Sequence, residues 1–342
     1  MDLADHRATI AIAVGPTLET LAREALASCH ADLLAARQTV LSSRDAVGIH
    51  GTRVALRRLR AAATLFGRSL HDEMFLALRA DAKQLADACG ATRDLDVFLT
   101  GVLAEAEGVF AGHADIVDDL RSFRAAALRL RRTRHDAVRR VLSSEIFAVF
   151  DARLTGLLAA PQRPAPPPPP PVLLSAIKLG QAMPDEVQVT AMPDAADFAR
   201  DVLRRRDRKL RKGLGRVDDL DGGRRHALRL QVKKQRYAAQ FLATLFDRKA
   251  AAAYIHGAAG LQDALGLAND RIVAAKVVAD VRAAARPKGR LDWVAGVLAG
   301  WLAIRAQGSD KDDRALAAAT KRFTKAPRFW RGSARGEDGD GT

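Results

Sequence analysis

Apolar residues recur every three to four positions along most of this chain, which is the spacing of amphipathic α-helices. No segment shows the alternation of apolar and polar residues that is typical of a β-strand, so the fold is predicted to be all-α. The predicted helices cover about residues 17–42, 46–70, 71–89, 93–107, 113–158, 194–213, 222–247, 248–285 (broken near 266) and 289–325 (interrupted at 308–310).

The predicted helix over 46–70 has two chemically different faces. One face is apolar and is predicted to join the core. The other carries a histidine and then a row of cations at i+3, i+7 and i+10: His50, Arg53, Arg57 and Arg60. A solvated helix usually pairs Glu with Lys or Arg four positions apart, but no acid interrupts this row. The row therefore calls for a functional explanation.

A second row occurs 176 positions later in the chain. This offset brings the first row and the adjacent Arg58 onto His226, Arg229, Lys233, Lys234 and Arg236. Without a gap, the same offset carries Leu85, Asp87, Ala88, Gly90, Asp94 and Val97 onto Leu261, Asp263, Ala264, Gly266, Asp270 and Val273. Two separate matches in one register predict an internal duplication.

The length of 342 residues agrees with two structural units of roughly 150 residues each. Between them lies a segment that is mostly proline (161–171), which predicts a stiff polyproline spacer. We therefore predict a first four-helix repeat over 1–160, a linker over 161–193, a second four-helix repeat over 194–330 and a disordered tail over 331–342. Aromatic residues make up only 5% of the chain, which favours closely packed helices over sheets.

The chain carries 55 Lys and Arg against 40 Asp and Glu, a net charge of +15. Such an excess predicts a polyanionic partner, whether nucleic acid, an anionic membrane surface or an inorganic polyanion. A row that spans ten residues is about 15 Å long, enough to follow several phosphates of a linear chain. Arginine forks pair with two phosphate oxygens at once, and a histidine beside phosphate gains charge on protonation.

The two cysteines, Cys29 and Cys89, lie in helical patterns and lack the spacing of a metal or redox motif. Both are predicted to be buried free thiols in a reducing compartment. The N-terminus lacks the pattern of a signal peptide, and the longest apolar run (293–304) is too short to span a bilayer. A soluble, cytoplasmic protein without membrane insertion is expected.

No catalytic or cofactor motif is visible in the sequence. There is no Walker loop, nucleophile elbow or histidine pair with zinc-ligand spacing, so neither a metal site nor a cofactor is expected. Asp94 and Asp96 could suggest magnesium, but the second copy has Ile272 in place of the second acid. A helix cap or an ion pair with a neighbouring Arg is the preferred role for these acids. We therefore expect a binding protein and not an enzyme.

Three motifs closely resemble the CHAD family, the "conserved histidine α-helical domain". They are His50-x-x-Arg53-Val54-x-x-Arg57-Arg58-Leu59-Arg60, then Leu85 to Gly90 with Arg93-Asp94-Leu95-Asp96-Val97, and His226-x-x-Arg229 to Lys233-Lys234-x-Arg236-Tyr237. The resemblance covers about residues 10–330. It implies two antiparallel four-helix bundles related by a pseudo-twofold axis, with a basic central cavity between them. It also implies binding of inorganic polyphosphate and association with polyphosphate granules, by a stand-alone member without a CYTH domain.

The resemblance also implies which residues face the ligand. These are His50, Arg53, Arg57, Arg58 and Arg60 in the first copy and His226, Arg229, Lys233, Lys234 and Arg236 in the second. On a helical wheel Arg58 and Lys234 point about 80° away from the histidines, so they are flanking candidates. The second copy departs from the pattern at Gln231 and Gln235, where the first copy has apolar residues.

Other functions compete with polyphosphate binding. A protein that binds single-stranded nucleic acid usually adds aromatic residues between its cations, and here only Tyr237 lies beside one. A phosphohydrolase needs a cluster of metal-binding acids, and the Asp94–Asp96 pair does not repeat. A purely structural helical scaffold would not need acid-free rows. Binding of other polyanions stays open, and no obligate protein partner can be identified.

Overall fold

A computed structural model describes residues 16–70, 73–161, 194–215, 222–285, 289–306 and 310–332. Within these residues the secondary structure is helical and contains no strand, so the all-α prediction is confirmed. Residues 1–15, nearly all of the linker predicted over 161–193 and nearly all of the tail predicted over 331–342 lie outside the described residues. None of the described helices is long and apolar enough to cross a membrane.

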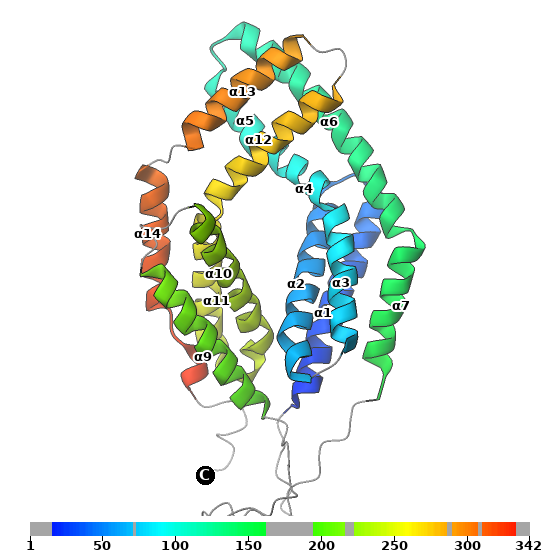
Figure 1. The fold of residues 1–342 in the computed structure, drawn as a ribbon, viewed down its shortest axis with the longest axis vertical. Coiled ribbons are helices and arrows are strands. Elements are labelled where there is room, and N and C mark those ends of the chain that lie inside the picture. Colours follow the sequence, from blue (N-terminus) through cyan, green and yellow to red (C-terminus); the bar gives the residue numbers. More distant parts are fainter. Residues whose placement is uncertain are drawn as a thin grey trace, which may run out of the picture.

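In chain order, the helices form two consecutive runs (Figure 1). The first run comprises α1 (Leu18–Ser42), α2 (Ala46–Leu70), α3 (Glu73–Ala88), α4 (Gly90–Val97), the π-helix η1 (Phe98–Val102), α5 (Leu103–Val109), α6 (Ala114–Leu142) and α7 (Glu145–Ala159). The second comprises α9 (Ala195–Leu214), α10 (Gly222–Leu242), the 3₁₀ turn η2 (Ala243–Leu245), α11 (Arg248–Ala264), α12 (Leu267–Ala284), α13 (Arg290–Ala306), α14 (Asp310–Lys325) and the 3₁₀ turn η3 (Phe329–Arg331).

Helix boundaries in the two runs follow the offset seen in the sequence. The first residues of α1 to α4 and of α9 to α12 lie 175 to 177 positions apart: Leu18 and Ala195, Ala46 and Gly222, Glu73 and Arg248, Gly90 and Leu267. The internal duplication itself remains an inference from the sequence. In both runs the second helix carries the histidine and its row of cations.

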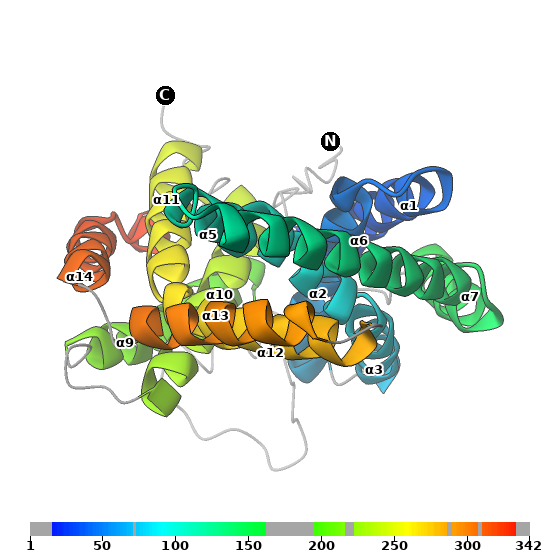
Figure 2. The same ribbon diagram turned by 90° about the horizontal axis from the view of Figure 1, so that it is seen from above.

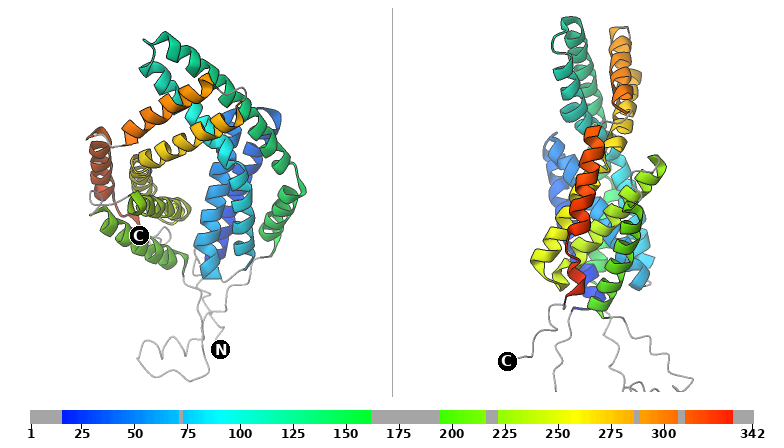
Figure 3. Two further views of the ribbon diagram at one scale, coloured as in Figure 1. Left: turned by 45° about the horizontal axis from the view of Figure 1, so that its top comes forward. Right: turned by 90° about the vertical axis from the view of Figure 1, so that its left-hand side faces the viewer.

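Two hydrophobic cores join the two runs of helices. The lower core collects buried residues of α1 to α3 and α7 together with residues of α9 to α11 and α14. The upper core joins α4, η1, α5 and α6 to α12 and α13. Seen from above, α6 and the α12–α13 pair run alongside one another across the top of the molecule (Figures 2 and 3). Each half of the chain therefore contributes to both cores.

Small residues let α2 pack closely against α1. A Cβ atom added at Gly48 would lie 2.9 Å from both Val40 Cγ2 and the Val40 backbone nitrogen, and one added at Gly51 would lie 2.9 Å from Ala36 Cβ. Because real Cβ contacts are not that short, this face of α2 tolerates no side chain there. The contact fixes the rotation of α2, and its basic face is turned towards the second run of helices.

The expectation of one long helix over 113–158 is wrong, because α6 and α7 are separate. Ser143 and Ser144 lie between them, and Ser144 has extended backbone angles (φ −88°, ψ 169°). The Ser144 hydroxyl donates to the Val141 carbonyl at 2.8 Å, and Glu145 stands in the first turn of α7. Serine hydroxyls compete with helical hydrogen bonds in this way, so the pair ends one helix and begins the next.

Gln235 departs from the apolar pattern for a structural reason. Its buried side chain donates to the Tyr254 hydroxyl at 3.0 Å, and that hydroxyl donates to Asp207 at 2.9 Å. Asp207 also accepts from Arg211 and from Arg328, and the second contact holds the residues just before η3 against α9. Buried polar groups are stable when they are hydrogen-bonded, so Gln235 belongs to this polar network in the core.

Candidate anion-binding groove

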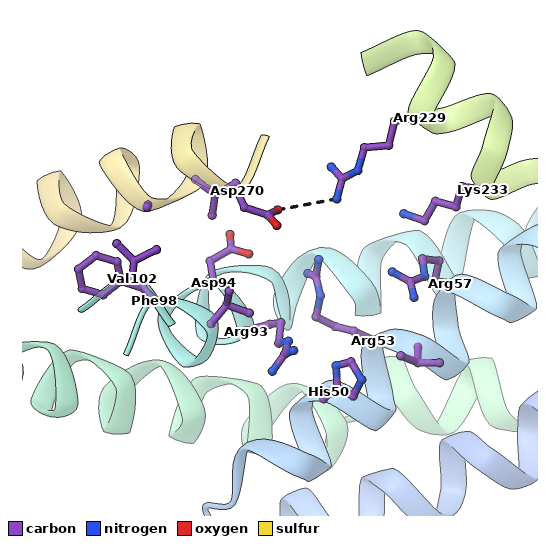
Figure 4. Close-up of a pocket in the computed structure, with 14 residues that line it drawn as sticks. His50, Arg53, Arg57, Arg93, Asp94, Phe98, Val102, Arg229, Lys233 and Asp270 are labelled. Atoms are coloured by element: carbon purple, nitrogen blue, oxygen red, sulfur yellow. Dashed lines mark ion pairs between the residues drawn. The ribbon is translucent and has the colours of Figure 1, made fainter. Parts of the chain in front are cut away.

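The two basic rows meet where α2 contacts α10 (Figure 1). An upper pocket of about 420 Å³ opens between the ends of these helices and α4 and α12. Its charged and polar lining consists of His50, Arg53, Arg57, Arg93, Asp94, Arg229, Lys233 and Asp270. Figure 4 shows His50, Arg53 and Arg57 on α2 and Arg229 and Lys233 on α10 converging from opposite sides. Cations far apart in the sequence thus share one site.

A lower pocket of about 570 Å³ continues from the upper one. Arg57 and Lys233 line both pockets, so the two form one groove, which we call the basic groove. No carboxylate lies among the described residues that line the lower pocket. Its cations are Arg57, Arg60, Arg68, Arg79, Arg206, Lys209, Lys233 and Lys234.

Glycines at the starts of α4 and α12 make room for two of the arginines. A Cβ atom at Gly90 would lie 3.1 Å from Arg53 Nη1, and one at Gly266 would lie 3.5 Å from Arg229 Nη2. Arg53 Nη1 also donates to the Ala86 carbonyl at 3.3 Å. The 176-residue offset relates Gly90 to Gly266 and Arg53 to Arg229, so the two copies place their first arginine in the same way.

Lys233 lies at the junction of the two pockets. Burial and then the charges of Arg57, Arg229, Arg53 and Arg236 lower its pKa to about 8. The charges that act on this amine are all positive, so its environment disfavours the protonated form. An anion bound in the groove would reverse this balance, because a nearby negative charge favours the ammonium.

His50 stands at the edge of the upper pocket. Its side chain is exposed by surface area, but partial burial of the imidazole and the charges of Arg93, Arg57 and Arg53 lower its pKa from the ordinary value of 6.5. The imidazole is therefore neutral at pH 7 in the free protein. A neutral ring still offers one N–H donor to an anion, and it gains a charge if the anion raises its pKa.

Two carboxylates, Asp94 on α4 and Asp270 on α12, face each other across the upper pocket (Figure 4). Arg229 Nη2 lies 3.8 Å from Asp270 Oδ1. Partial burial raises the pKa of Asp94, while the charges of Arg53, Lys276, Arg134 and Arg93 oppose the rise. The upper pocket is therefore mixed in charge, whereas the lower pocket is purely cationic.

The groove brings together seven of the ten residues predicted from the sequence. His50, Arg53, Arg57, Arg229 and Lys233 line the upper pocket, and Arg60 and Lys234 line the lower one. Three others line neither pocket. Arg58 forms an ion pair with Asp32 of α1, Arg236 lies over the Tyr237 ring at 5.0 Å, and His226 is exposed elsewhere on α10. Ligand contact by these three stays a prediction from the family resemblance.

Several groove residues were not singled out as ligand-facing from the sequence. These are Arg93, Asp94 and Asp270 in the upper pocket and Arg68, Arg79, Arg206 and Lys209 in the lower one. The first three lie within the motif that repeats at the 176-residue offset, which was an available signal. The others come from α2, α3 and α9, and only the packing of these helices shows that they converge.

The structure also shows the surroundings of Asp96 and of the two cysteines, which the sequence singled out as reactive groups. Asp96 is buried and forms an ion pair with Arg131 of α6 at 2.5 Å, as expected for an acid of this motif. Cys29 and Cys89 are free and buried, and burial raises the pKa of each thiol to about 11. Among the described residues, no group of three or more His, Cys, Asp or Glu side chains is arranged to hold a metal ion.

The fold and the groove define an all-α protein in which matching basic helices from two halves of one chain meet at a shared site. The chain belongs to the CHAD family, because the model of the CHAD domain matches residues 24–279. A crystal structure of the CHAD domain from the plant Ricinus communis aligns with a TM-score of 0.71 and 23% sequence identity, over 92% of this chain and 94% of that chain. PptA from Streptomyces chartreusis aligns with a TM-score of 0.56 and 16% identity, over 93% of this chain and 100% of that one. At these identities the two likenesses show the fold alone, and a search of curated proteins finds no significant match.

Proposed function

We propose that this protein binds inorganic polyphosphate along the basic groove, without catalysing a reaction on it. One observation carries the proposal: two cationic rows meet in one groove whose lower pocket is lined by eight cations and no acid among the described residues. Membership of a family associated with polyphosphate supports the choice of ligand. The proposal includes a cytoplasmic location at polyphosphate granules.

The chemistry of the groove matches a flexible chain of phosphates. Arginine forks can bind two phosphate oxygens, and charge-assisted hydrogen bonds of this kind are about twice as strong as neutral ones. The charges that act on Lys233 in the free protein are repulsive, so a bound anion would relieve that repulsion. A polyanion that follows the groove would contact both rows and reach from the upper into the lower pocket.

Single-stranded nucleic acid fits the groove less well. Bases bound without sequence preference usually stack on exposed aromatic rings. Tyr237 lines the lower pocket but is only 3% exposed, and the Arg57 and Arg236 guanidinium groups lie over its ring. A base could not reach the face of this ring without displacing an arginine. We therefore expect polyphosphate to compete successfully against single-stranded DNA.

Charge reversal at the junction of the two pockets tests the proposal. We expect Arg57→Glu with Lys233→Glu to abolish binding of long-chain polyphosphate in calorimetric titrations at about 150 mM salt, with helicity unchanged by circular dichroism. Exposed Arg121→Glu with Arg132→Glu on α6 makes the same change in net charge away from the groove. This control should retain most of the affinity. Equal losses in both variants, or full binding by the groove variant, would refute a site at the groove.

A competition experiment tests the choice of ligand. Polyphosphate already bound should resist displacement by an excess of single-stranded DNA at the same salt concentration. Counterion release weakens every polyanion contact as salt rises, so both ligands must be compared under one condition. Equal affinity for the two, with the same salt dependence, would indicate a general basic surface.

A further inference from the structure

The upper pocket has two features for which a bare phosphate chain has no use. Part of its wall is apolar and consists of Val54, Val97, Phe98, Val102, Val273 and Ala274. In addition, the Asp94 and Asp270 carboxylates face into it (Figure 4), although carboxylates repel phosphate. The lower pocket also has apolar lining, from Ala61, Leu230, Tyr237 and Ala238, but no carboxylate lies among the described residues that line it. The two halves of the groove therefore differ in the hydrogen-bond acceptors that they offer.

The apolar wall is built by an irregular stretch of helix. Phe98 and Val102 are the first and last residues of the π-helix η1, and π-helical turns occur frequently at functional sites. The 176-residue offset relates Phe98 to Ala274, which lies in the regular helix α12 and lines the same pocket. Phe98 and Ala274 are only 1% and 2% exposed. The accessible apolar surface at the α4–α12 end of the groove therefore comes from Val97, Val102 and Val273.

Apart from Arg93 of α4, the cations of the upper pocket lie at its other end, on α2 and α10. There Arg57 and Lys233 lead into the lower pocket. The groove thus presents, in order, an apolar wall, two hydrogen-bond acceptors and a row of cations. Nucleotides have the matching order of groups: a flat base, a ribose with two hydroxyl donors, and a chain of phosphates. The cavity of about 420 Å³ also falls within the range of about 300–1,000 Å³ that is usual for small-molecule sites.

We propose that the upper pocket binds the nucleoside end of a nucleoside polyphosphate. In this arrangement the base contacts the accessible side chains of Val97, Val102 and Val273, and the ribose hydroxyls donate to Asp94 and Asp270. The phosphates reach Arg57 and Lys233 and enter the lower pocket. The inference rests on the proposed function of the groove as a polyphosphate site, and it names a second class of ligand for it.

Comparison of ATP and GTP with inorganic tripolyphosphate tests this inference, because all three carry three phosphates. Calorimetric titrations at pH 7.5 and about 150 mM salt should show at least one nucleotide binding about fivefold or more tightly than tripolyphosphate. Tripolyphosphate carries the higher charge density, so electrostatics alone would favour the opposite order. If neither nucleotide binds more tightly than tripolyphosphate, the inference is wrong.

A pair of variants on α12 localises the effect. Val273→Trp fills the upper pocket and should remove the advantage of the nucleotide while leaving tripolyphosphate affinity within about twofold. Ile272→Trp adds the same side chain at the neighbouring residue, which is 73% exposed and does not line the pocket. This control should keep the advantage. A nucleotide preference that survives Val273→Trp would overturn the assignment to this pocket.

The same titrations separate this inference from the proposed function. Tight binding of long-chain polyphosphate and of tripolyphosphate, with no gain from the nucleoside, would contradict only the inference. Failure of long-chain polyphosphate to bind the wild-type protein would contradict the proposed function.

Discussion

At the scale of single residues, Lys233 connects the electrostatics of the groove to its expected behaviour. Its pKa of about 8 is below the value of 10.5 for a free lysine, because burial and four arginines disfavour the charged amine. Because the pKa of Lys233 is lower in the folded state than in the unfolded state, the unfolded chain binds this proton first as the pH falls from about 10.5 to about 8. The free energy of unfolding therefore decreases over that interval. The groove is thus electrostatically strained without a ligand, and a bound polyanion removes that strain.

This arrangement predicts that polyphosphate binding takes up protons. Bound phosphate raises the pKa of Lys233, so affinity should rise as the pH falls from about 9 to about 7. Protonation of His50, whose pKa lies below 6.5 in the free protein, should extend the rise towards pH 6. Titration calorimetry in buffers of different ionisation enthalpy measures the proton uptake directly.

The matched variant is Lys233→Arg, since arginine stays charged throughout this range. Its affinity should be nearly constant between pH 7 and pH 9. A wild-type affinity that does not change over the same interval would remove Lys233 from the contact.

At the scale of elements, the rotation of α2 depends on close packing against α1. A methyl group at Gly48 would clash with Val40, so Gly48→Ala should lower the free energy of unfolding by about 1–3 kcal/mol despite the better helix propensity of alanine. In α7, a Cβ at Gly156 meets nothing within 4 Å. Gly156→Ala should therefore raise stability by about 0.5–1 kcal/mol. Urea denaturation of both variants tests the difference, and equal effects would show that the α1–α2 contact is not tight.

At the scale of the whole molecule, the two halves depend on each other through shared cores. The Phe66 ring of α2 lies 6.4 Å from the rings of both Phe198 and Phe241, which belong to the second half. Helices α4 and α6 likewise share the upper core with α12 and α13. Each half alone would expose large apolar surfaces, which disfavours independent folding.

Cooperative unfolding of the full chain is the expected consequence. Calorimetry should show a single transition, and Phe66→Ala should shift that whole transition to lower temperature by removing about 3–5 kcal/mol of stability. Two separated transitions, of which Phe66→Ala moves only one, would show that the halves are independent domains.

The sequence by itself determined the helical fold class, most helix boundaries and the two basic rows. These are local properties, since the spacing of apolar residues within one segment decides which face is buried. It missed the break at Ser143 and Ser144, where polar side chains interrupt an otherwise continuous helical pattern. It also left Gln235 without a partner, because that partner is Tyr254, on the next helix.

Only the tertiary structure decided which cations share a site. Arg93, Arg206 and Lys209 join the basic groove because α4 and α9 pack beside the helices of the two rows, whereas Arg58 lies one residue from Arg57 yet pairs with Asp32 outside the groove. The same packing brings Asp94 and Asp270 face to face across 176 residues of sequence. Such contacts depend on how helices cross, and a helical pattern specifies the face of each helix but not its neighbour.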